Sequence, residues 1–284
     1  MKEMAGIIAA LERTGKVRIL SDLHLGHDLS TVRTVASLRP LIAGASTVVF
    51  NGDTYQERKS GFRIKAAAML EELQALCREE GAEAIFLRGN HDPETFAWEL
   101  LDLEEGRVTI THGDVWLRLI SPWSREMPQL RPVLEKIHAA SATGGVVDLE
   151  EKFEILRRCR LALPPSMTRQ RDQSFRARAN LFFREIWPPR RPWEVLKVYA
   201  QLPGLAGAFV EQYRPRCQVL VFGHTHRAKI WRRGGRLLVN TGAFVTFAAP
   251  LMVEIEEGMV KVLSLTGDSE GWRIREVIRR ARLR

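Results

Sequence analysis

Four short apolar runs of this chain each end in side chains that can bind a metal ion. The clearest run, residues 84–88, is followed without a break by Gly89, Asn90, His91 and Asp92. A short apolar run bounded by glycine is typical of a buried strand in a sheet covered on both faces. The other runs are residues 17–20 before Asp22 and His24, 47–50 before Asp53, and 218–222 before His224 and His226. Ligands collect at the carboxyl ends of strands in α/β sheets, so these endings predict one shared site.

The pattern around these runs predicts an α/β fold, with residues 1–284 forming a single domain. Residues 62–80 place apolar side chains at helical spacing between two of the strands. Strand signals then stop over a long stretch, and we predict a helical insertion, or lid, over residues 121–216. We also expect an amphipathic first helix before Gly15 and a basic amphipathic helix over residues 271–284.

Composition limits the class of protein. The chain has 284 residues, 45% of them hydrophobic, and no run approaches the ~18 apolar residues of a membrane span. Cys77, Cys159 and Cys217 are odd in number and widely separated, which argues against a disulfide framework and against a thiolate metal site. These features predict a cytoplasmic protein in a reducing compartment.

The charge of the chain points to an anionic partner. The net charge is +9, and the basic excess lies after residue 120. A phosphorylated small molecule, lipid-linked or nucleotide, is the favoured partner, and nucleic acid is the less favoured one. The basic helices also suggest peripheral contact with the inner surface of a membrane. The alternative interpretation is that these arginines lie on solvated helix faces and bind nothing.

The candidate metal ligands combine carboxylate, amide and imidazole groups without a thiolate, which suits Mn, and also Fe or Zn. They are Asp22, His24, Asp53, Asn90, His112, His224 and His226. Seven ligands exceed what one ion needs, so we predict two divalent ions that share a bridging carboxylate.

These residues form five short motifs in a fixed order along the chain. The motifs are Asp22-Leu23-His24, Gly52-Asp53, Gly89-Asn90-His91-Asp92, His112-Gly113 and Gly223-His224-Thr225-His226. The set resembles the calcineurin-like metallophosphoesterases over roughly residues 17–114 and 217–264. The resemblance implies a four-layer α/β/β/α sandwich of two mixed sheets, with the helical insertion added to it.

The resemblance also implies a role for each residue. Asp22, His24 and His226 would hold the first metal ion, Asn90, His112 and His224 the second, and Asp53 would bridge them. His91 would be the catalytic residue, donating a proton to the leaving oxygen while a metal-bridging hydroxide attacks phosphorus. The expected activity is hydrolysis of a phosphate ester or a diphosphate bond.

At one position the chain departs from the family pattern. The Gly-Asp motif usually carries a second acid three residues later, which pairs with the catalytic histidine, but here that residue is Gln56. An amide can orient an imidazole, although it stabilises the imidazolium less than a carboxylate does. The departure therefore concerns the protonation of His91 and not the metal ligands.

Three alternatives remain open. Bacterial hydrolases of UDP-2,3-diacylglucosamine share the Ser-Asp-Leu-His-Leu opening, the His-Gly-Asp element and a helical insertion, but commonly have Arg at the position of His91 and an acid at that of Gln56. Related members of the family cut DNA, so a metal-dependent nuclease is a second alternative. The third is a non-catalytic scaffold with the same fold, although every ligand position here is filled.

Overall fold

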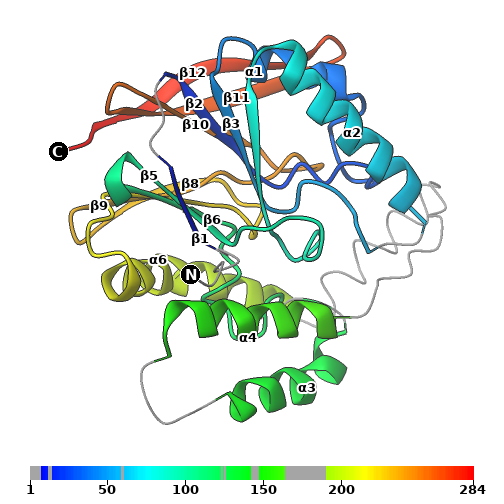
Figure 1. The fold of residues 1–284 in the computed structure, drawn as a ribbon. Coiled ribbons are helices and arrows are strands. Elements are labelled where there is room, and N and C mark those ends of the chain that lie inside the picture. The colour runs from blue at the N-terminus through cyan, green and yellow to red at the C-terminus, as the bar shows by residue number, and fades with distance from the viewer. Residues whose placement is uncertain are drawn as a thin grey trace, which may run out of the picture.

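The computed structural model describes residues 8–11, 15–58, 61–122, 124, 126–141, 147–163 and 190–284. Within them, two six-stranded sheets lie face to face (Figure 1). Sheet A has the order β1 (Ile8–Leu11), β5 (Leu100–Leu103), β6 (Val108–Thr111), β7 (Val219–Phe222), β9 (Arg236–Asn240), β8 (Lys229–Arg233). Sheet B has the order β12 (Gly271–Arg282), β11 (Met259–Asp268), β10 (Leu251–Glu256), β2 (Val17–Leu20), β3 (Thr47–Asn51), β4 (Glu83–Leu87).

Both sheets are mixed, and the parallel part of each one carries the ligand motifs. In sheet B, β2, β3 and β4 are parallel neighbours, and β10, β11 and β12 continue the sheet antiparallel. In sheet A, β6, β7 and β9 are parallel, while β8 returns as a hairpin on β9. The carboxyl ends of the parallel strands therefore gather the polar residues that follow them.

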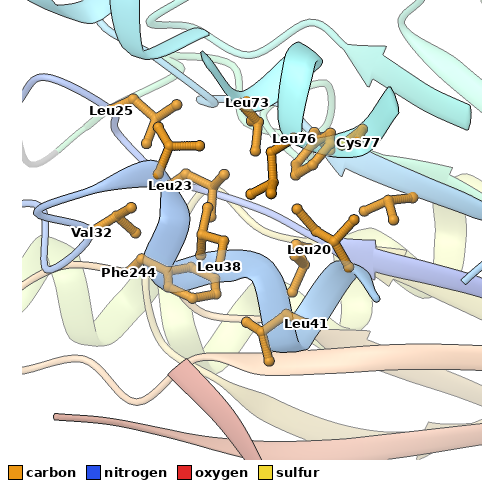
Figure 2. Packing of buried hydrophobic residues seen from close by; sticks show 14 of the residues in the cluster. Leu20, Leu23, Leu25, Val32, Leu38, Leu41, Leu73, Leu76, Cys77 and Phe244 are labelled. Carbon is orange, nitrogen blue, oxygen red and sulfur yellow. The ribbon is translucent and has the colours of Figure 1, made fainter. Parts of the chain in front are cut away.

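Three apolar layers hold the sandwich together. The inner faces of the two sheets share one core, which includes Ile19, Val49 and Val221. The outer face of sheet B packs against α1 (Arg39–Ile42), the 3₁₀ turn η1 (Val35–Leu38) and α2 (Arg63–Glu79), as Figure 2 shows for Leu20, Leu38 and Leu73. The outer face of sheet A packs against the helices of the insertion. The predicted four-layer sandwich of two mixed sheets is therefore confirmed.

The region between β6 and β7 is helical in the part that the structure describes. It contains α3 (Met127–Ala140), α4 (Leu149–Ala162) and α6 (Arg190–Tyr213). Residues 164–189 of the predicted insertion lie outside the described residues. Among the helices within the described ranges, none combines the length and apolar character needed to cross a membrane. The single-domain assignment and the lid role of residues 121–216 stay predictions.

A buried arginine fastens the insertion to the sheet. Arg160 of α4 donates two hydrogen bonds to Asp114, of 2.7 and 2.8 Å, and further bonds to both oxygens of Glu99. All three side chains are buried. Asp114 lies two residues after His112, a predicted metal ligand, so α4 is joined directly to the segment that follows β6.

The helices expected at the two ends of the chain are wrong where the structure describes them. Residues 8–11 form β1, which pairs in parallel with β5. The basic tail forms β12, which pairs with β11 through two register shifts. Each shift breaks the two-residue alternation of a strand, so Ile274, Ile278 and Ala281 mimic helical spacing. The basic tail is therefore an edge strand and not the expected helix.

Candidate metal centre

The structure brings all seven predicted ligands to one edge of the sandwich. Each follows a strand: Asp22 and His24 after β2, Asp53 after β3, Asn90 after β4, His112 after β6, and His224 and His226 after β7. Two clusters of ligand atoms form there, one of Asp22, His24, Asp53 and His226, the other of Asp53, His112 and His224. Asp53 belongs to both clusters, which is the arrangement expected of a bridging carboxylate.

In the first cluster, two imidazole nitrogens converge. Nε2 of His24 and Nε2 of His226 are 2.9 Å apart. Nε2 of His226 lies 3.4 Å from Oδ1 of Asp22, and Nε2 of His24 lies 3.9 Å from Oδ2 of Asp53. Two nitrogens and two carboxylates that face one point form the donor set of a divalent cation site.

The second cluster is centred on the other side of Asp53. Nε2 of His112 lies 3.5 Å from Oδ2 of Asp53 and 3.4 Å from Oδ1 of Asn90. Asn90 thus joins this cluster as the sequence predicts, and its carbonyl oxygen is the atom turned toward the ligands. His224 completes the set.

Backbone carbonyls fix the ring nitrogen that each histidine of the second cluster offers. Nδ1 of His112 donates to the carbonyl oxygen of Asn51 over 3.1 Å, so Nε2 is the nitrogen that faces Asp53 and that a metal ion could bind in place of a proton. Nε2 of His224 donates to the carbonyl oxygen of Ile120 over 2.9 Å, so its lone pair is on Nδ1. Metal-binding histidines usually have such partners on the second nitrogen, and these residues therefore fit a divalent ion.

The charges of the site also favour a cation. Burial alone would raise the pKa of Asp53, but His112, His91 and His24 hold it well below its usual value. Burial alone would lower the pKa of His112, but Asp53 and the other nearby carboxylates raise it to about 10. The same negative potential that holds a proton on His112 would attract a metal ion in its place.

A buried carboxylate braces the loops that carry the ligands. Asp92 accepts hydrogen bonds from the backbone N–H groups of Gly89, Asp53 and Thr54, of 2.7, 3.1 and 2.6 Å. Burial, together with the nearby charge of Asp53, raises the pKa of Asp92 to about 7. In the sequence Asp92 belongs to a motif, but its role cannot be predicted there because two of its partners, Asp53 and Thr54, follow another strand.

Close approach explains two glycines of the motifs. A Cβ atom on Gly89 would lie 2.2 Å from Oδ1 of Asp53, and one on Gly223 would lie 2.1 Å from Oδ2 of Asp22. Such distances are far shorter than any van der Waals contact. The two glycines therefore leave room for the carboxylates of Asp22 and Asp53, which are predicted to bind metal.

The match to a known family adds to this geometry. A sequence model of the calcineurin-like phosphoesterases matches residues 15–228, which include every predicted ligand. The chain belongs to this family. Among curated proteins, none matches the chain.

Several solved structures are similar to this chain at low sequence identity. A predicted phosphoesterase of Streptococcus pneumoniae TIGR4 is 14% identical, with 92% of this chain and 97% of that chain covered and a TM-score of 0.40. Vps29 of Cryptosporidium parvum is 13% identical, with 95% and 100% covered and a TM-score of 0.45. A cold-active protein-tyrosine phosphatase of Shewanella is 14% identical, with 97% and 82% covered and a TM-score of 0.41.

The predicted catalytic histidine lies beside the carboxylate of Asp53 that the two clusters share. The backbone N–H of His91 donates to Oδ1 of Asp53 over 2.8 Å, and its ring Nε2 lies 3.9 Å from Oδ2. The ring borders a cavity of roughly 240 Å³, which Val195 and Tyr199 of the insertion helix α6 also line. The sequence does not identify Val195 and Tyr199 as lining residues, since helical spacing alone does not show which face of a helix meets the site.

Proposed function

We propose that this protein is a metal-dependent hydrolase of phosphate esters or diphosphates that works with two divalent ions. The observation that carries the proposal is the pair of ligand clusters that share Asp53 at the wall of a cavity. In this proposal Asp22, His24 and His226 hold one ion, and Asn90, His112 and His224 hold the other. The nitrogen and oxygen donors favour Mn, with Fe and Zn as alternatives.

Divalent ions in such a centre activate water and neutralise the charge on the phosphoryl oxygens. The residues of the chain supply the rest. His91 lines the cavity, and its Nε2 lies 3.9 Å from Oδ2 of Asp53, where it can donate to the oxygen of a leaving group. The wall formed by Val195 and Tyr199 excludes water from one side of the substrate, and the ring of Tyr199 is held by its hydroxyl, which donates to the carbonyl oxygen of Thr225 over 2.9 Å.

A second candidate, a diphosphatase of the UDP-2,3-diacylglucosamine type, draws support from a neighbouring cavity. It measures roughly 300 Å³ and lies between the 115–120 segment and helices α3 and α4. Apolar side chains such as Leu117, Ile155 and Leu156 line it together with Arg118 and Lys152. A cavity of this kind suits a substrate with an acyl chain and a charged group, and Ile120 joins it to the metal ligand His224.

The test combines metal analysis with a panel of substrates. The protein is expected to bind about two Mn ions per chain and to hydrolyse members of a panel of aryl and alkyl phosphates, nucleoside diphosphate sugars and DNA. Asp53→Asn should lose most of both ions and all activity, whereas Asp28→Asn, the same change at an exposed position, should change neither.

The panel also separates the alternatives. Cleavage of DNA alone would identify a nuclease, and preference for a lipid-linked nucleotide diphosphate would identify the diphosphatase. Binding of metal without cleavage of any substrate would support a scaffold. Full metal content in Asp53→Asn would rule out a bridging role for that carboxylate.

A further inference from the structure

The departure from the family pattern at Gln56 has a structural context that the sequence does not reveal. The buried carboxamide of Gln56 lies between two histidine rings, with Nε2 2.8 Å from Nδ1 of His24 and Oε1 3.1 Å from Nδ1 of His91. Backbone bonds hold it there, because Gln56 N–H donates to the carbonyl oxygen of Leu25 and Glu57 N–H donates to that of His91. One amide therefore serves a metal ligand and the proposed catalytic residue together.

The chemistry of this contact links the two rings. An amide end has one acceptor oxygen and one donor NH₂, and a neutral imidazole has one N–H and one lone-pair nitrogen. The Nδ1 that meets the NH₂ group must carry a lone pair, and the Nδ1 that meets the oxygen must carry a proton. Gln56 thus forces His24 and His91 into opposite tautomers. A carboxylate at this position would accept from both rings and impose no such difference.

Metal binding by His24 decides which of the two arrangements holds. The ligand atom of His24 is Nε2, since this nitrogen faces His226 and Asp53. A lone pair on Nε2 leaves the ring proton on Nδ1, which must then face the oxygen of Gln56. The amide oxygen and nitrogen are nearly equal in size, so a half-turn of the carboxamide gives this arrangement without other movement. The NH₂ group then faces Nδ1 of His91.

We propose that Gln56 is a positioning residue that couples the tautomer of His91 to metal binding by His24. With the ion on His24, the proton of His91 is placed on Nε2, which faces the cavity beside Asp53. This inference rests on the proposed metal-dependent function and narrows its substrate class. A neutral imidazole that accepts a hydrogen bond at Nδ1 can donate a hydrogen bond from Nε2 to the leaving oxygen. It cannot readily transfer that proton completely, because the ring would become an anion.

A hydrogen bond from Nε2 of His91 is enough for a leaving group that departs as a stable anion. The phosphate that leaves a diphosphate is such a group. In its hydrolysis the oxygen of water bonds to phosphorus, the bridging P–O bond breaks, and the departing phosphate keeps the electron pair. Near neutral pH the two protons of water go to solvent. An alkyl alkoxide, by contrast, needs a proton as it leaves. We therefore assign diphosphates, ahead of alkyl phosphate esters, as the substrate class.

The test reads the tautomers directly. Long-range ¹H–¹⁵N NMR of the Zn²⁺-loaded protein distinguishes the two tautomers of a histidine, and loss of signals in His91→Phe identifies His91. We expect His91 to carry its proton on Nε2 in the zinc-loaded protein. In zinc-loaded Gln56→Glu, we expect a proton on Nδ1 of His91. Gln218→Glu, at the far end of β7, is the matched control and should match the unaltered protein.

Kinetics give an independent measurement. The ratio of kcat/KM for a nucleoside diphosphate sugar to that for glycerol phosphate should fall on the order of tenfold or more in Gln56→Glu. A carboxylate that accepts from Nδ1 lets His91 carry a second proton on Nε2, and the ring stays neutral after this proton passes to the leaving oxygen. An unchanged ratio of kcat/KM in Gln56→Glu would overturn the inference. So would a proton on Nδ1 of His91 in the unaltered, zinc-loaded protein. Metal analysis of the same samples separates this failure from that of the proposed function, because a protein that binds no zinc removes the premise for both.

Discussion

Five of the proposed ligands stand on backbone that non-glycine residues rarely adopt. The φ angles of Asp22, His24, Asp53, His224 and His226 lie between 48° and 67°. Left-handed backbone costs roughly 1–2 kcal/mol for a residue with a side chain. The surrounding hydrogen bonds, such as those of Asp92 to the loop of Asp53, hold the chain in this conformation. Such strain is found mainly where a protein places groups for function.

Residue-scale packing gives a sharp prediction for Gly89. In Gly89→Ala the new methyl group collides with the side chain and backbone of Asp53, so Asp53 must move away from both clusters. The affinity for metal, measured by titration against a chelator, should fall on the order of 10- to 100-fold. Gly204→Ala is the matched control, because a Cβ there meets no atom within 4 Å. It should keep the affinity and add up to about 1 kcal/mol of helix stability.

The ligands themselves could be predicted from the sequence because each follows a strand within a few residues. The apolar run and the polar residue after it are therefore visible together in the sequence. Asn90 follows β4 by only three residues, for example. The carbonyl groups of Asn51 and Ile120 and the two contacts of Gln56 could not be predicted. These groups become partners of the ligands only when separate strands and loops meet, and no spacing in the sequence encodes that meeting.

At the scale of elements, the attachment of α4 depends on one buried charge. Arg160 faces two carboxylates in the interior, and Arg160 and Asp114 share two parallel hydrogen bonds. Burial alone would raise the pKa of Asp114, but Arg160 lowers it. The carboxyl group of Asp114 therefore stays ionised, and the charge of Arg160 is what compensates it in the interior.

Removal of this arginine should be costly. Arg160→Leu leaves Asp114 and Glu99 as buried carboxylates without their main partner, and the free energy of unfolding should fall by about 3–5 kcal/mol. Denaturation by urea measures the change. Arg157→Leu, on the same helix, removes an exposed pair with Glu154 and should cost at most about 1 kcal/mol. Equal losses in the two variants would show that the buried network does not stabilise the fold.

The elements in the middle of the chain were easier to predict than those at its ends. The helix expected over residues 62–80 is α2, whose apolar spacing is regular. The tail has the apolar spacing of a helix although it forms the edge strand β12. The register shifts of this strand leave apolar residues such as Ile274 and Val277 partly exposed, so they do not alternate as in a regular strand. Its arginines also suit an edge strand, since charged side chains there discourage pairing with another chain.

At the scale of the whole molecule, the three cysteines report on the intact core. Cys77 packs in the layer outside sheet B, and Cys159 and Cys217 pack in the layer outside sheet A. Burial raises the pKa of each thiol to about 11. The reactive thiolate therefore forms at higher pH in the folded protein than in the unfolded chain.

Thiol labelling should accordingly follow unfolding. At pH 8 the folded protein should react with Ellman's reagent at well under a tenth of the rate of the chain in guanidinium, where all three thiols should react. Rapid labelling of one cysteine in the folded protein would show that the layer containing it opens to solvent.

The division of the ligands between the sheets has one more consequence. Asp22, His24, Asp53 and Asn90 extend from sheet B, whereas His112, His224 and His226 extend from sheet A. Any ion bound by ligands from both sheets would act as a cross-link between the two sheets at one edge of the sandwich. Its binding energy would be shared with the fold, since a ligand that binds only the native state stabilises that state. Loss of the metal would then lower the stability of the folded protein, and its resistance to degradation, as well as its activity.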